Sequence, residues 1–349
     1  MGVPDRMHPP GGMPRGARNL ITDVPGVRVG HVTLAEGGVQ TGVTAVLPHE
    51  GNLFRDKVAA ACHVINGFGK SAGLMQLEEL GTIETPLLLT NTFGVGTCVN
   101  AAVRYMLGQN PEIGDTTGTV NPLVLECNDG VLSDIRGLHV REDHALAAIA
   151  AAGEDFAEGA VGAGRGMCCY GLKGGIGSAS RLVELGGETY TVGTLLMTNF
   201  GETRDLLVYG DPVGARISGA SQKDRGSVVV ILATDLPVSC RQLGRMTRRV
   251  QSGLGRTGAV VSGGSGELAV AFTTANRMPH FAQEQVLTRR LLHEDALDVV
   301  FRAVTECVEE SVLSSLYHAE TVVGRAGHTR LSLADAMAGI GERLGEERI

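Results

Sequence analysis

The sequence predicts an α/β protein in which short apolar strands alternate with amphipathic helices. Short runs of apolar and β-branched residues, bounded by turn residues, are typical of buried strands. Between several of them, apolar residues recur at steps of three and four, as on one face of a helix. The chain also has 50 glycines in 349 residues, roughly twice the usual 7 %, and they are interleaved with the apolar runs. This pattern indicates tight turns and close backbone packing in a layered fold.

Seven segments have the length and apolar content of strands, and five have the character of helices. The predicted strands, in order, are 43–48, 58–66, 85–92, 119–126, 190–198, 228–234 and 267–273. The predicted helices are 71–80, 97–108, 142–152, 239–252 and 295–319. The apolar face of the last helix consists of Leu297, Val300, Phe301, Val304, Val308 and Val312. The inner stripe of 239–252 consists of Leu243, Met246 and Val250. Neither an internal repeat nor an interdomain linker interrupts this order.

The most informative local feature is the junction of Gly226 and Ser227, where the polar run 221–226 meets the strand 228–234. Glycine has no Cβ to block attack on its own carbonyl, and the strand would hold the serine Oγ rigidly. If this peptide bond broke, Ser227 would gain a free α-amine with a pKa of about 8, suited to act as a base. The junction therefore predicts a self-cleaving N-terminal nucleophile. A polar loop that enters an ordinary core strand has the same pattern.

A second candidate group is the glycine-rich turn 262–267, which leads into the strand 267–273. Ser265 and Glu267 are two residues apart, so their side chains point to the same side of an extended backbone. A hydroxyl and a carboxylate aimed together can relay a proton for a nucleophile on a neighbouring strand. The alternative is a flexible loop with a solvated glutamate.

A third candidate is Asn199, which ends the strand 190–198 and precedes a turn that contains Gly201. A side-chain amide at a strand end can donate to a developing oxyanion. Such an amide also caps turns without taking part in any chemistry.

Together these features resemble the DmpA-type aminopeptidases, the peptidase family of the L-aminopeptidase/D-esterase and the β-aminopeptidases. The resemblance covers nearly the whole chain. Its ordered matches are ITDVPGVRVGH (21–31), GVTAVLP (42–48), VINGFGKS (64–71), LLTNT (88–92), ECNDG (126–130), LKGGIGSASR (172–181) and GDPVG (210–214). In that family a second serine lies 38 residues after the nucleophile, with an acidic residue two further on. Ser265 and Glu267 stand in these places relative to Ser227.

The resemblance implies an αββα sandwich like that of N-terminal nucleophile hydrolases. It implies that Ser227 is the nucleophile, that Ser265 and Glu267 handle its proton, and that Asn199 donates to the oxyanion. It also implies a homo-oligomer, a tetramer by family. The family's best-known members add a tyrosine hydroxyl near the ECNDG stretch, and this sequence has no tyrosine there. A backbone N–H is the alternative second donor.

We therefore predict a cofactor-free, metal-independent serine aminopeptidase that releases amino-terminal residues from small peptides, amides or esters through an acyl-enzyme. A disordered tail, 1–20, precedes one catalytic domain, 21–349, which is cut between Gly226 and Ser227 into chains 1–226 and 227–349. Two alternatives stay open within enzymes, an oligoamide hydrolase and an acyltransferase on the same fold. From another class, a catalytically silent binding or assembly protein also remains open.

Composition narrows the other possibilities. The net charge of −8 argues against a nucleic-acid partner, and no apolar run approaches the length of a membrane span. Seven cysteines without a Cys-x-x-Cys pair indicate reduced thiols in a cytoplasmic protein. Cys127 has to be weighed as a nucleophile, although most such thiols are small buried groups. The ten scattered histidines do not form a zinc-binding helix motif.

Overall fold

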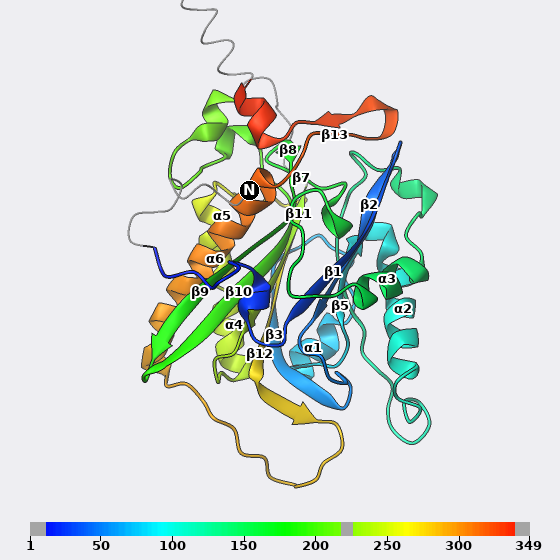
Figure 1. Ribbon diagram of the computed structural model, residues 1–349, viewed down its shortest axis with the longest axis vertical. Coiled ribbons are helices and arrows are strands. Elements are labelled where there is room, and N and C mark those ends of the chain that lie inside the picture. Colours follow the sequence, from blue (N-terminus) through cyan, green and yellow to red (C-terminus); the bar gives the residue numbers. More distant parts are fainter. Residues whose placement is uncertain (1–11, 218–225, 339–349) are drawn as a thin grey trace, which may run out of the picture.

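The computed structural model describes residues 12–217 and 226–338 and contains two main sheets that face each other (Figure 1). The first sheet has the order β1–β2–β5–β6, made by β1 (Arg28–Glu36), β2 (Val39–Leu47), β5 (Leu87–Asn91) and β6 (Leu123–Cys127). The second has the order β4–β3–β12–β11–β10–β9. Its strands are β4 (Thr82–Ile83), β3 (Asp56–Gly67), β12 (Gly266–Pro279), β11 (Ser227–Thr234), β10 (Glu188–Asn199) and β9 (Gly175–Leu185).

Helices cover the outer face of each sheet. On the four-stranded sheet lie α2 (Val95–Leu107) and α3 (Glu142–Ala150). On the six-stranded sheet lie α4 (Cys240–Thr247) and α6 (Leu297–Tyr317), and α5 (Val250–Arg256) packs against α6. The short helix α1 (Leu74–Leu80) follows β3 and packs against it. Two small hairpins complete the fold, made by β7 (Cys168–Cys169) with β8 (Leu172–Lys173) and by β13 (Val322–Val323) with β14 (Thr329–Arg330). The predicted αββα sandwich is confirmed.

Side-chain alternation along the central strands divides the apolar residues between separate cores. In β11, Val229 and Ile231 face the four-stranded sheet, whereas Val228 and Val230 face the helices. This division follows from the two-residue period of a strand. Since both faces are covered, the strand is apolar throughout, which is why its sequence is an uninterrupted hydrophobic run.

The predicted helices and strands occur in the structure, and their bounds differ at several ends. The predicted helix 239–252 is divided into α4 and α5, although its stripe of Leu243, Met246 and Val250 is buried as expected. The predicted strand 119–126 begins only at Leu123.

Two long strands, β1 and β9, lack the apolar runs on which the strand predictions depended. In β9, a Cβ on Gly177 would come within 1.9 Å of the Ser311 carbonyl oxygen in α6. The small residues of β9 thus let α6 approach its backbone closely, and this packing cannot be seen in a hydropathy pattern.

The predicted disorder of the tail 1–20 is wrong for residues 12–20, and the part before residue 12 lies outside the described residues. The backbone N–H of Met13 donates to a carboxylate oxygen of Glu306 at 2.9 Å, and that of Gly16 donates to Ser180 Oγ at 3.1 Å. Leu182 N–H donates to the Pro14 carbonyl at 2.8 Å. Hydrogen bonds to α6 and β9 therefore order this segment despite its glycine- and proline-rich composition.

Candidate active site

The candidate site lies where the ends of three neighbouring strands meet. Ser227 is the first residue of β11; it pairs with Asn199, the last residue of β10, and with Gly266, the first residue of β12. Ser227 shares the face of Val229 and Ile231, so its side chain belongs to the side of the sheet that faces the other sheet. Directly opposed residues of antiparallel strands project to the same face. Asn199 is therefore held beside Ser227 by the ladder itself.

The carbonyl group of Gly226 lies among hydrogen-bond donors. Ser227 Oγ–H donates to the Gly226 oxygen at 2.8 Å, and the backbone N–H of Gly266 donates to the same oxygen at 3.2 Å. The Gly266 N–H thus polarises this carbonyl in the way that an oxyanion donor does. A Cβ on Gly226 would lie only 1.7 Å from the Asn199 carbonyl oxygen. Glycine is required here by close backbone approach, a reason that the sequence alone did not show. The polar run 221–225 before it lies outside the described residues.

Ser265 and Glu267 are on the same side of the chain, as their spacing predicts. The Ser265 hydroxyl donates to Glu267 Oε1, and both residues are buried. They flank Gly266, the residue that pairs with Ser227. The solvated-loop alternative is therefore wrong, because neither side chain faces water.

Asn66 fixes this loop from the neighbouring strand β3. Its Nδ2 donates to the carbonyl of Ser262 at 3.1 Å and also to that of Ser265. Asn66 is a site residue to which no sequence pattern gave a role, although a polar residue next to Gly67 at the end of a strand is a signal that could have identified it.

The carboxamide of Asn199 is held by two backbone groups. Its Oδ1 accepts the N–H of Cys168 at 2.8 Å, and its Nδ2 donates to the Asn128 carbonyl at 2.9 Å. Since a backbone N–H can only donate, this contact fixes which end of the carboxamide is oxygen and which is NH₂. A carboxamide NH₂ carries two hydrogens, so one remains for a further acceptor beside Ser227.

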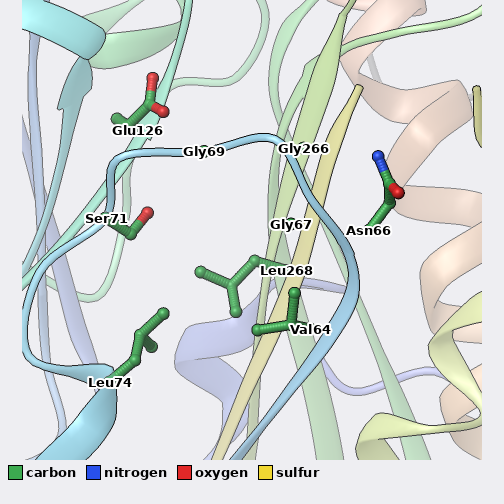
Figure 2. A pocket seen from close by; sticks show the side chains of 9 residues that line it. All are labelled: Val64, Asn66, Gly67, Gly69, Ser71, Leu74, Glu126, Gly266 and Leu268. Atoms are coloured by element: carbon green, nitrogen blue, oxygen red, sulfur yellow. The ribbon is translucent and has the colours of Figure 1, made fainter. Parts of the chain in front are cut away.

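A pocket opens next to these residues (Figure 2). Its volume is about 80 Å³, and it is lined by Val64, Asn66, Gly67, Gly69, Ser71, Leu74, Glu126, Gly266 and Leu268. Figure 2 shows Glu126 and Ser71 on one side and Asn66 on the opposite side. The walls combine aliphatic side chains with one carboxylate. Among the described residues that line this pocket there is no tyrosine, in agreement with the tyrosine missing from the sequence motif.

Glu126 is a second residue of the site to which no sequence pattern gave a role. It is 5 % exposed; its Oε1 accepts the N–H of Lys70 at 2.8 Å, and its Oε2 accepts the hydroxyl of Thr92. The signal was a glutamate at the end of the apolar strand β6. The loop 68–73 connects β3 to α1 and forms one edge of this pocket.

Cys127 is poorly suited to be the nucleophile. Its side chain is completely buried between the two sheets, and its Sγ lies 3.7 Å from the Met197 carbonyl oxygen. Burial raises the pKa of the Cys127 thiol well above its usual range, and the nearby carboxylate of Glu126 raises it further. The reactive thiolate is therefore strongly disfavoured.

Within residues 12–217 and 226–338, no three His, Cys, Asp or Glu side chains are grouped so that they could hold a metal ion. In the same part of the chain, no helix combines the length and hydropathy needed to cross a bilayer.

Comparison with known proteins gives matches over nearly the full length. The model of peptidase family S58 matches residues 19–330. The β-peptidyl aminopeptidase BapA of Sphingosinicella microcystinivorans is 39 % identical over 341 residues, covering 90 % of this chain and 85 % of that protein. The PH0078 protein from Pyrococcus horikoshii OT3 has 49 % identity and a TM-score of 0.91, with 96 % of this chain and 97 % of that one covered.

A third similar protein is the L-aminopeptidase D-Ala-esterase/amidase from Ochrobactrum anthropi. It has 34 % identity and a TM-score of 0.88, covering 96 % of this chain and 97 % of that chain. That structure is described as a prototype for the serine aminopeptidases and as a new variant of the Ntn hydrolase fold.

Proposed function

Because this chain belongs to peptidase family S58, it is a serine aminopeptidase of the Ntn type, and we propose that its nucleophile is Ser227, freed by cleavage of the chain itself. The observation that carries the proposal is the hydrogen bonding of the Gly226 carbonyl, whose oxygen accepts from both Ser227 Oγ and the Gly266 N–H. Family membership argues against the non-enzymatic alternative.

Self-cleavage begins when Ser227 Oγ attacks the Gly226 carbonyl carbon. The developing oxyanion accepts the Gly266 N–H, which already points at this oxygen. The C–N bond then breaks, the proton from Oγ passes to the departing amine, and an ester joins the two residues. Water hydrolyses the ester to give a Gly226 carboxylate and a free Ser227 α-amine. The proposed products are chains 1–226 and 227–349.

Turnover repeats this chemistry on a substrate. The substrate carbonyl takes the place of the Gly226 carbonyl, so that its oxygen lies between the Gly266 N–H and the Asn199 NH₂. The Gly266 N–H thereby donates to the substrate oxygen in place of the tyrosine hydroxyl that this sequence lacks. Ser227 Oγ attacks, the leaving amine takes a proton, and water hydrolyses the acyl-enzyme. The α-amine of Ser227 accepts and returns the proton, with Ser265 and Glu267 as its relay. Every catalytic group in these steps belongs to the chain, and the other reactants are the substrate and water.

The pocket accounts for the choice of substrates that have a free amino terminus. Glu126 is a buried carboxylate beside aliphatic walls, and an ammonium group is the partner that compensates its burial. We place the free amine of the substrate against Glu126 and its side chain against Val64, Leu74 and Leu268. An oligoamide hydrolase or acyltransferase could use the same acyl-enzyme, but this carboxylate favours substrates with a free amino group. The related enzymes named for β-peptides and for L-amino acids support an accepted residue of L, D or β type.

We also propose a cytoplasmic homo-oligomer, a tetramer by family resemblance. The segment between β12 and α6 carries Phe281, Val286 and Leu291, each more than half exposed, and such apolar surface favours association. All seven cysteines are unpaired, in keeping with a reducing compartment.

Light scattering on the purified protein should give the mass of four copies. Changing Val286 and Leu291 together to serine should lower that mass, whereas Val260→Ser, at an exposed residue outside the segment, should not. A wild-type mass of one copy would contradict the proposal. Cell fractionation, with a periplasmic and a cytoplasmic marker as controls, tests the compartment.

Purified protein should contain a 123-residue chain that begins at Ser227. Ser227→Ala should leave one intact chain of 349 residues without peptidase activity, because no nucleophile remains. Ser227→Cys should retain part of both reactions, since a thiol makes the same acyl shift. Intact-mass measurement with amino-terminal sequencing checks this prediction. Active protein whose only amino terminus is residue 1 or 2 would contradict it.

Glu267→Gln should lower kcat by ~10² to 10⁴-fold, the usual range for general acid–base catalysis, because glutamine keeps the size but removes the charge from the relay. The measurement is kcat between pH 6 and 9 on enzyme whose mass shows complete processing. Glu184→Gln is a matched control, because Glu184 also accepts a hydroxyl, that of Thr189, but in an exposed hairpin. Wild-type kcat in processed Glu267→Gln enzyme would remove Glu267 from the mechanism.

Glu126→Gln should lower kcat/KM for peptides with a free amino terminus by about 10- to 100-fold, as expected for loss of a charged hydrogen-bond partner. Most of the loss should appear in KM. Glu78→Gln, on the exposed face of α1, controls for a general effect of charge. The assignment fails if Glu126→Gln keeps the wild-type ratio of activity between free and N-acetylated peptides.

A further inference from the structure

Lys173, in the short strand β8, is completely buried. Its ammonium donates to three backbone carbonyls, those of Gly164 at 3.0 Å, Met167 at 2.7 Å and Gly174 at 2.6 Å. An ammonium has three N–H donors, so these acceptors satisfy all of them. The Lys173 ammonium thus links three carbonyl groups of the segment 164–174 to one another.

Burial of this charge is costly. Burial lowers the pKa of Lys173 to about 7, and none of the carboxylates in the described ranges forms an ion pair with it. An unpaired buried charge normally lowers stability unless hydrogen bonds compensate it. Here the hydrogen bonds that compensate the charge come from backbone carbonyls, so the ammonium ties together the carbonyl groups of Gly164, Met167 and Gly174.

The same segment carries the contact that orients Asn199. Cys168 lies opposite Lys173 in the β7–β8 ladder, and its N–H donates to Asn199 Oδ1 at 2.8 Å. Met167, the residue before Cys168, gives its carbonyl to the ammonium. The peptide unit that joins Met167 and Cys168 therefore connects the two: its oxygen binds Lys173 and its N–H binds Asn199. A peptide unit is planar, so fixing its oxygen also fixes the direction of its N–H.

We propose that Lys173 is a positioning residue for the peptidase reaction, in which its ammonium holds the Met167–Cys168 peptide so that the Asn199 carboxamide presents its NH₂ to the reacting carbonyl. The inference rests on the proposed role of Asn199 as oxyanion donor. Lys173 touches no reacting atom and acts through this one peptide unit.

A double-mutant cycle tests the inference. Lys173→Gln removes the charge and one of the three N–H donors, and it should lower kcat about 10- to 100-fold with KM within about twofold, because Asn199 acts on the transition state. In an Asn199→Ala background the same change should alter kcat by less than about twofold, since linked groups are not additive. Lys57→Gln is the matched control. Lys57 is a partly buried lysine paired with Glu84, and its substitution should leave kcat unchanged in both backgrounds.

The measurements are kcat and KM on protein shown by mass to be processed. For any variant whose processing is slow, the rate of cleavage between Gly226 and Ser227 is measured in place of kcat. If Lys173→Gln does not fold, Lys173→Arg, which keeps the charge and N–H donors, replaces it in both backgrounds and should lower kcat only when Asn199 is present. Equal losses in both backgrounds, or an unchanged kcat, would overturn the inference. A wild-type kcat in Asn199→Ala alone would instead show that the proposed role of Asn199 is wrong.

Discussion

Ser227 stands at the point where an antiparallel ladder and a parallel ladder share one strand, and the rest of the site depends on this position. The antiparallel ladder fixes Asn199 opposite it, and the parallel ladder fixes Gly266 beside it. A shift by one residue would turn every side chain of β11 to the other face. Such a shift is opposed by the two apolar cores on either side of the strand. Core packing therefore sets the position of the nucleophile.

Close backbone contact is the second constraint. Gly226 fits only without a Cβ, because the Asn199 carbonyl lies against it. A Cβ on Gly266 would likewise lie 2.8 Å from the Phe68 carbonyl oxygen and 3.2 Å from Ser227 Oγ. These contacts bring a peptide N–H within hydrogen-bonding distance of the Gly226 oxygen. A backbone donor fixed by a sheet needs little reorganisation when charge develops on that oxygen.

Around the strand ends, polar side chains support backbone groups more often than they meet one another. Asn66 binds two carbonyls of the 262–265 turn, and Lys173 binds three carbonyls of the segment beside Asn199. Glu126 accepts the N–H of Lys70. Each of these residues stabilises a loop that cannot be held by apolar burial, since loops carry unpaired peptide groups. Rigid support of this kind is what preorganised catalytic groups require.

The sequence by itself determined the α/β class, most of the strands and helices, and the candidates Ser227, Ser265, Glu267 and Asn199, because apolar runs and strand-end polar residues are local patterns. The family resemblance added the αββα layers. Only the tertiary structure decided which strand ends meet, that Cys127 is sealed between sheets, and that Glu126 lines the pocket. The tertiary structure also decided the order of residues 12–20, which bind α6, and the assignment of β9 as a strand. Both features depend on contacts between segments far apart in the chain. The same distinction holds for the site. The local sequence shows which residue types are present, whereas the hydrogen-bond partners of Gly226, Asn199 and Lys173 are peptide groups of distant segments, which no local pattern specifies.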